Sequence, residues 1–158
     1  MEINVAFWNL GNLFDTLDDP ISDDFDFTPA GGWTTETQQT KVTNLASVID
    51  YMFNGAGPDL LGVCEVENEA TLQQLVDSVT VRNDLEILQF QDGPDIRGID
   101  CALVYSNQKF EPITLGGSEP TAPASHIVHN RYPTRDIFEV ALRVISRCPP
   151  WKCEARGG

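Results

Sequence analysis

Two different spacings of apolar residues predict the elements in the first half of the chain. Residues 3–8 form a short apolar run with β-branched and aromatic members, and residues 59–66 form another, so both are predicted to be buried strands. Residues 38–53 carry apolar side chains at helical spacing, and the Gly and Pro residues of 54–58 predict the end of that helix. The apolar face of the predicted helix consists of Val42, Leu45, Ala46, Ile49, Met52 and Phe53.

Strand patterns become more frequent in the second half. Asn68 predicts the N-cap of a helix over residues 69–79. The strands predicted after it cover residues 85–90, 99–105, 110–115 and 136–145. The last is a long strand that would place Phe138, Val140, Leu142 and Val144 on one face. Residues 15–36 and 116–135 are predicted to be loops. The order β-α-β-α-β-β-β-β predicts an α/β fold, with a mixed sheet and flanking helices on one face.

The charge of the chain is strongly negative and unevenly distributed. The formal net charge is −14, and residues 1–100 hold 3 Lys and Arg against 19 Asp and Glu. Such a field repels phosphate backbones, which argues against non-specific binding of nucleic acid. It does not argue against a phosphate site that depends on a cation, because carboxylates are the groups that hold the metal in such sites.

Several features bear on the cellular location. The chain contains no apolar run of about 18 residues, so no membrane span is predicted. The first ten residues lack the basic and apolar regions of a signal peptide. Cys64 and Cys101 lie within apolar strand-like runs and are predicted to be buried free thiols. Together these features predict a cytoplasmic protein.

Polar residues gather where predicted strands end. Asn9 follows the first strand and Asn12 lies on the turn beyond it, while Glu65 lies near the end of the second strand. Ligands of α/β sheets bind at the carboxyl ends of strands, and a carboxylate beside an amide oxygen suits Mg²⁺. Arg97 precedes a later strand, where its planar guanidinium suits a phosphate oxygen, and Asp100 lies within that strand.

Each of these residues has a simpler explanation. Asn9 can serve only as a turn former, and Glu65 can be a surface charge at the end of a strand. Arg97 and Asp100 can pair with each other. Residue spacing alone therefore predicts no more than an α/β protein with a candidate cation site.

The combination of motifs resembles the endonuclease/exonuclease/phosphatase superfamily, which includes pancreatic deoxyribonuclease and the apurinic/apyrimidinic endonucleases. The motifs that carry the resemblance are WNLGNLFD at 8–15, PDLLGVCEVEN at 58–68, DIRGIDCALVYS at 95–106 and YPTRDIFEVAL at 132–142. They follow the order of the family and cover about residues 4–145.

The resemblance implies a phosphodiester hydrolase that uses Mg²⁺ or Mn²⁺ and acts on a phosphodiester, with nucleic acid among the candidate substrates. Glu65 would be the direct metal ligand, and Asn9 would orient the phosphate or the water in the shell of the metal. Asn12, Arg97 and Asp100 would lie near the substrate. The family fold is a four-layer α/β sandwich, of which this chain would supply about half.

The chain also departs from the family pattern. Gly11 and Cys64 stand where bacterial relatives often have Glu and Gln. The later Asn-x-His, Gly-Asp-x-Asn and Ser-Asp-His signatures do not follow residue 145, and His126 and His129 are predicted to be surface residues rather than substitutes. Residues 1–145 are therefore predicted to be a partial domain, and residues 146–158 an irregular tail from a truncation or frameshift. The chain alone is expected to be inactive.

Two other functions stay open. A non-catalytic binding or regulatory module would pair through the apolar sheet face that half a sandwich leaves exposed. A redox or metal-binding protein would use Cys148 and Cys153, but their Cys-x-x-x-x-Cys spacing does not match the thioredoxin pattern. The acidic segment 15–26 lacks the spacing of a calcium loop and is predicted to be solvated.

Overall fold

The structure is a computed structural model that describes residues 2–20, 22–88, 93–113, 124–128 and 134–145. Its elements follow the order β1 (Val5–Leu13), η1 (Phe25–Phe27), η2 (Pro29–Gly31), α1 (Thr35–Gly55), β2 (Leu60–Val66), α2 (Glu69–Ser78), β3 (Leu85–Leu88), β4 (Asp100–Ser106), β5 (Phe110–Pro112), β6 (Ala124–His126), β7 (Ile137–Glu139) and β8 (Leu142–Val144). None of the helices in these ranges is both long and apolar enough to cross a membrane.

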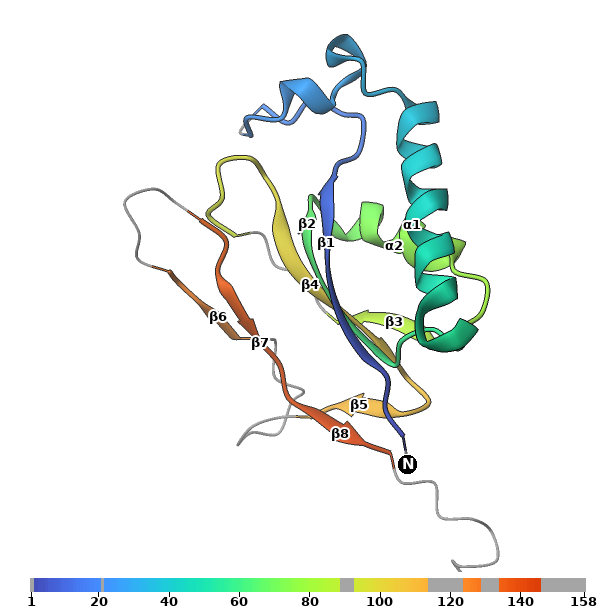
Figure 1. Cartoon of the computed structure of the whole chain (residues 1–158). Coiled ribbons are helices and arrows are strands. Elements are labelled where there is room, and N and C mark those ends of the chain that lie inside the picture. The colour runs from blue at the N-terminus through green and yellow to red at the C-terminus, as the bar shows by residue number, and fades with distance from the viewer. Residues whose placement is uncertain (1, 21, 89–92, 114–123, 129–133, 146–158) are drawn as a thin grey trace, which may run out of the picture.

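A four-stranded mixed sheet forms the centre of the fold, in the order β1-β2-β4-β3. The strands β1 and β2 are parallel and are joined by α1, whereas β4 is antiparallel to both β2 and β3. Both α1 and α2 lie on one side of this sheet, and β6 and β7 lie on the other side (Figure 1). The predicted α/β class, with a mixed sheet and helices on one face, is confirmed.

The core lies between the helices and the sheet. Its buried side chains include Val42, Leu45, Ala46 and Ile49 of α1, Leu72 and Leu75 of α2, and Leu61, Val63, Ala102 and Val104 of the sheet. Capping fixes where each helix starts, since Thr34 accepts a hydrogen bond from the Thr37 amide and Asn68 accepts one from the Thr71 amide. The predicted Asn68 cap is confirmed.

The end of the predicted first helix is wrong in detail. Met52 and Phe53 leave the helical conformation, and Phe53 takes a left-handed φ of 55°. The Phe53 side chain is 39% exposed and so does not continue the buried face. The helical backbone therefore stops at Met52, earlier than the apolar spacing predicts, and the chain then turns through residues 54–57 into β2.

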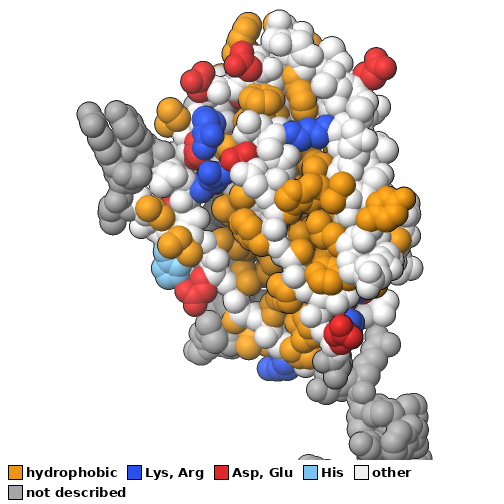
Figure 2. Space-filling view, viewed as in Figure 1, with side chains coloured by type: hydrophobic (Ala, Val, Ile, Leu, Met, Phe, Trp, Pro, Cys, Tyr) orange, Lys and Arg blue, Asp and Glu red, His pale blue; other side chains and the backbone are white. Residues whose placement is uncertain are grey.

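The sheet face opposite the helices exposes apolar side chains. Phe7 is 71% exposed and Val5 is 61% exposed, and both point away from the helices because Ala6 and Trp8 face the core. The Phe7 ring lies over Gly62, where a Cβ atom would come within 2.8 Å of the ring. Apolar side chains, drawn in orange, gather in the central part of the view in Figure 2.

The single strand predicted over residues 136–145 is two short strands. The first, β7, pairs with β6, and the second, β8, pairs with β5 in a separate two-stranded sheet. The alternating pattern is compatible with both strands, but it does not reveal that they have different partners. The strand β6 also falls within the predicted loop 116–135, and η1 and η2 fall within the predicted loop 15–36. Residues 146–158, with Cys148 and Cys153, and His129 lie outside the described residues.

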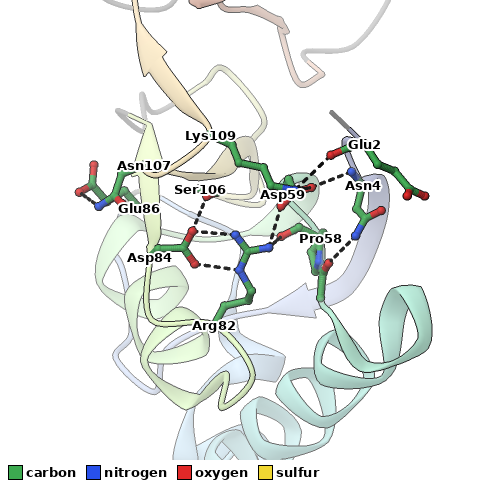
Figure 3. A network of polar contacts seen from close by, with 11 residues as sticks. Glu2, Asn4, Pro58, Asp59, Arg82, Asp84, Glu86, Ser106, Asn107 and Lys109 are labelled. Carbon is green, nitrogen blue, oxygen red and sulfur yellow. Dashed lines mark hydrogen bonds and ion pairs between the residues drawn. The ribbon is translucent and has the colours of Figure 1, made fainter. Parts of the chain in front are cut away.

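A buried polar network holds the end of the sheet where β2 begins (Figure 3). The Arg82 guanidinium contacts Asp59 and Asp84 at 2.7 Å each, and the Asp59 side chain is fully buried. Lys109 reaches the other Asp59 oxygen at 2.7 Å, and the Asn4 amide donates to that same oxygen. The network therefore ties the start of β1 and β2 to the β4–β5 turn, at the opposite end of β2 from Glu65.

Candidate functional site

The strands β1 and β2 both become irregular before they end. Their ladder shifts register between Asn9 and Leu13, and the β2–β4 ladder shifts between Cys64 and Val66. Glu65 has a φ of 62° and Asn12 a φ of 61°, both in the left-handed region. Such a conformation costs a non-glycine residue about 1–3 kcal/mol and is concentrated at functional sites. The left-handed backbone at Glu65 and Asn12 makes this end of the sheet the candidate site.

The Glu65 carboxylate is the centre of the contacts at this end. Its side chain is 16% exposed, and its Oε1 atom accepts a hydrogen bond from Arg135 Nη1 at 3.2 Å. The Asn9 side chain and the Asn12 backbone amide also donate to this carboxylate. Burial raises the pKa of Glu65, but these hydrogen bonds and the Arg135 charge outweigh burial and hold the pKa below its usual value. Glu65 is therefore ionised at neutral pH.

Asn9 and Asn12 contribute to the site in different ways. The Asn9 Oδ1 atom accepts a hydrogen bond from the Gly11 amide at 2.7 Å, which orients the other end of the carboxamide as the donor to Glu65. Asn12 reaches Glu65 through its backbone amide instead of its side chain. The bulge between Asn9 and Leu13 thus aims two N–H donors at one carboxylate.

Lys41 on α1 contacts the backbone of the bulge between Asn9 and Leu13. The sequence pattern did not predict this role. The Lys41 Nζ atom donates to the carbonyl oxygens of Gly11 and Asn12, the latter at 3.1 Å, and lies 5.6 Å from the centre of the Trp33 ring. Burial lowers the pKa of Lys41, and the Glu65 charge opposes that shift. A signal was present, because Lys41 is the only Lys or Arg in residues 1–81.

Arg97 and Asp100 lie near this end of the sheet but do not pair with each other. Arg97 pairs with Asp95, with Nη2 and Oδ2 2.8 Å apart, and 47% of its side chain is exposed. The Glu65 charge acts on Arg97, whose pKa is raised chiefly by its hydrogen bonds to Asp95. Asp100 is buried and accepts a hydrogen bond from the Gly93 amide. The predicted alternative of an Arg97–Asp100 pair is wrong.

Arg135 therefore contacts Glu65 directly, and Arg97 is close enough for the Glu65 charge to act on it. Arg135 was part of a motif in the sequence, but its place at the site depends on the path of the chain before β7. Basic side chains gather in the upper part of the face shown in Figure 2, next to acidic ones. In a protein with a net charge of −14, these two arginines form a local concentration of positive charge.

A comparison with protein families matches residues 4–145 to the endonuclease/exonuclease/phosphatase family. The chain belongs to this family. The matched region includes the strands β1 and β2 as well as Arg97 and Arg135. No curated protein and no solved structure matches the chain. The family covers phosphodiesterases and phosphatases, so its chemistry is hydrolysis at phosphorus.

In this endonuclease/exonuclease/phosphatase family protein, a second polar region lies beside the segment that follows β1. A cavity of about 560 Å³ is lined by acidic side chains from three segments, which are Asp15, Asp18, Asp19, Glu67, Asp95 and Asp100. Burial raises the pKa of Glu67 to about 7, and the charges of Asp15, Asp24 and Asp19 add to that effect. Within the described ranges, no three His, Cys, Asp or Glu side chains are arranged to hold a metal ion.

The acidic segment is less solvated than predicted. Asp24 is only 1% exposed, and its Oδ2 atom accepts a hydrogen bond from the Asp19 amide at 3.2 Å. Phe14 and Phe27 stack beside it with ring centres 4.1 Å apart, so aromatic packing holds the segment against the body of the protein. The two cysteines in the described strands, Cys64 and Cys101, are free thiols as predicted, but only Cys64 is buried and Cys101 is half-buried.

Proposed function

We propose that this protein is a divalent-metal-dependent phosphodiester hydrolase of its family, in which Glu65 holds Mg²⁺ or Mn²⁺. The observation that carries the proposal is the Glu65 carboxylate, ionised, partly buried and fixed by Asn9 and Asn12 where two strands end. A structure that keeps a strained backbone to aim a single carboxylate is better explained by ligand binding than by stability.

The donor set fits the proposed cation. Mg²⁺ in phosphate enzymes is often held by one or two protein carboxylates, and water and substrate phosphate complete its shell. Glu65 supplies one carboxylate, and Asn9 lies in hydrogen-bond contact with it. In the free protein Arg135 balances the Glu65 charge, so the cation and Arg135 would share that carboxylate.

Each residue near Glu65 has a role in this proposal. The bound cation supplies a positive charge that polarises the phosphodiester. Asn9 directs its amide toward the phosphate or the attacking water, and Arg97 and Arg135 can bind non-bridging phosphate oxygens. Asn12 acts through its backbone amide on Glu65. Asp100, buried against Gly93, keeps the segment before β4 in place near Arg97.

This chain alone is expected to be inactive. A family mechanism needs a base that activates water, and His126 on β6 contacts Glu139 at 2.6 Å rather than Glu65. Cation binding is therefore the sharper test, with hydrolysis of a small phosphodiester measured beside it.

Mn²⁺ binding by calorimetry at neutral pH tests the proposal. We expect Glu65→Gln to abolish the binding isotherm, and Glu36→Gln, an exposed carboxylate in the first turn of α1, to leave it unchanged. Equal Mn²⁺ binding by wild type and Glu65→Gln would contradict the proposal. Robust hydrolysis of bis(p-nitrophenyl) phosphate that depends on Glu65 would support the metal site and contradict the expected inactivity.

The open sheet face supports a second candidate, a module that pairs with a second copy of the chain. Phe7 and Val5 are exposed on the same sheet face as Leu60 and Leu103 of the neighbouring strands. An apolar face of this kind suits a self-complementary contact. Sedimentation velocity across a range of concentrations tests this candidate. A dimer that Phe7→Ser dissociates supports it, and a monomer at all concentrations excludes it.

A further inference from the structure

Cys64 and Cys101 face each other directly across two strands of the central sheet. The antiparallel strands β2 and β4 pair these two residues in register. Directly opposed residues of an antiparallel pair project their side chains to the same face of the sheet. That face is the open one, because the adjacent residues Val63 and Ala102 are buried in the core against the helices. The two thiols therefore lie side by side on the face away from α1 and α2.

The hydrogen-bond pattern of the ladder places this pair where opposing side chains come closest. The Ser106 amide donates to the Asp59 carbonyl, so the backbone groups of alternate residues from Asp59 to Val63 point toward β4. The backbone groups of Cys64 point the other way, toward β1, so Cys64 and Cys101 form a non-hydrogen-bonded pair. Such pairs have Cα atoms about 4.5 Å apart, and a disulfide needs a Cα separation of about 4.4–6.8 Å. The register thus brings the two sulfurs within reach of a bond.

Solvent reaches the pair through one of its members. Both thiols are free, Cys64 is buried and Cys101 is half-buried. The two sulfurs are close enough for a charge on Cys64 to act on Cys101. Burial raises the pKa of both thiols, and the Arg135 charge opposes that shift at each of them. Thiol exchange here is therefore slow, so the product at equilibrium, rather than the rate, identifies the site.

We propose that Cys64 and Cys101 are an oxidative modification site, at which a small disulfide such as glutathione disulfide converts the two thiols into one cross-strand disulfide. The Cys101 sulfur attacks a sulfur of the reagent, forms a mixed disulfide and displaces the first glutathione. The Cys64 sulfur then attacks the Cys101 sulfur and releases the second glutathione. Two protein thiols and one glutathione disulfide thus become one protein disulfide and two glutathione thiols. The protein loses two electrons and two protons, and the reagent gains them.

The disulfide would join β2 and β4 where their ladder becomes irregular. Cys64 directly precedes Glu65, and the register of the two strands shifts between Cys64 and Val66. A covalent bond at this position fixes the strand that carries Glu65 to its neighbour, so the oxidation state of the pair acts on the backbone of the candidate site. The bond forms whether or not Glu65 binds a cation.

Mass spectrometry of the folded chain, after equilibration with oxidised and reduced glutathione, tests the proposal. Cys148→Ser and Cys153→Ser are introduced together, so that only Cys64 and Cys101 can react. We expect the internal disulfide to exceed the mixed disulfide by about tenfold or more, because the fold holds the two thiols at a high effective concentration. Cys64→Ser in the same background should carry only the mixed disulfide. Exchange in denaturing urea should yield mainly mixed disulfides.

Urea unfolding of the product then tests whether the bond has formed in the native register. The oxidised form should unfold at a higher urea concentration than the reduced form of the same chain, because the bond constrains the unfolded chain. Mixed disulfides or linked dimers as the main product of the folded chain would overturn the proposal. An oxidised form that unfolds at the same or a lower urea concentration would also overturn it, since the native pairing of β2 and β4 would then not accommodate the bond.

Discussion

Arg135 donates to Glu65 across 3.2 Å and so joins the segment before β7 to the strained end of β2. The two residues are 70 positions apart in the chain. Neither partner is fully exposed, since 25% of the Arg135 side chain and 16% of the Glu65 side chain remain accessible. The Arg135 guanidinium keeps the Glu65 carboxylate ionised and balances its charge when no ligand is bound.

Removal of the Arg135 guanidinium is expected to raise the pKa of Glu65. In Arg135→Ala only the Asn9 and Asn12 donors remain to oppose burial. A lowered carboxyl pKa stabilises the fold above the unfolded value of 4.5 and loses that contribution as the pH falls through the folded value. The variant should therefore lose stability above pH 4.5 and differ little from wild type in strong acid. Carbon-detected NMR titration of Glu65 checks the shift, and an unchanged pKa would show that Arg135 is dispensable.

Asn9→Asp should convert the site into a stronger cation site. The new carboxylate would replace a donor with a second negative charge beside Glu65, so the pKa of Glu65 should rise through repulsion. Mn²⁺ relieves that repulsion, and added ligand charge tightens binding, so we expect an affinity gain of about tenfold at neutral pH. Calorimetry measures the gain, with Asn44→Asp, on the exposed surface of α1, as the control. Equal affinities of Asn9→Asp and wild type would place the cation elsewhere.

Glu67 should make the protein less stable as the pH rises. Burial, with repulsion from Asp15, Asp24 and Asp19, raises the pKa of Glu67 from 4.5 to about 7. The folded state therefore keeps this proton over a range in which the unfolded state has lost it, and stability falls from pH 4.5 to about 7.

Glu67→Gln tests that pH dependence because Gln imitates the protonated carboxyl and can still accept from the Asp15 amide, which contacts Glu67 at 2.6 Å. The variant should match wild type near pH 4 and exceed its stability at pH 8 in urea unfolding. Glu69→Gln, on the exposed surface of α2, should retain the wild-type profile. Parallel profiles for wild type and Glu67→Gln would contradict the raised pKa.

Arg82 is expected to be the most important basic residue for stability. Arg82→Ala would leave the buried carboxylates of Asp59 and Asp84 without their shared partner, a change that costs about 3–5 kcal/mol when a buried pair is broken. Arg143→Ala breaks the exposed pair with Glu111 and should cost less than about 1 kcal/mol. Urea unfolding of both variants measures the difference, and equal costs would mean that the Arg82 network is effectively solvated.

Local patterns in the sequence predicted most of the central fold. The apolar spacing of α1, the short runs of β1 and β2, and the Asn68 cap are set by residues within a few positions of one another, so they were visible without the tertiary structure. The motifs also indicated the family and drew attention to Asn9 and Glu65. The same local logic joined β7 and β8 into one strand, because alternation shows which face is apolar but not which strand lies beside it.

Relations between distant positions were decided only when the chain folded. Arg135 reaches Glu65 and Lys41 reaches the Gly11–Asn12 bulge because the sheet and α1 bring these segments together, and no spacing rule encodes either contact. Arg97 forms its ion pair with Asp95. Asp100 is buried in β4 and accepts a hydrogen bond from the Gly93 amide instead. Residue types thus set which chemistry is available at each position, and long-range packing, which is non-local in sequence, determined which groups meet.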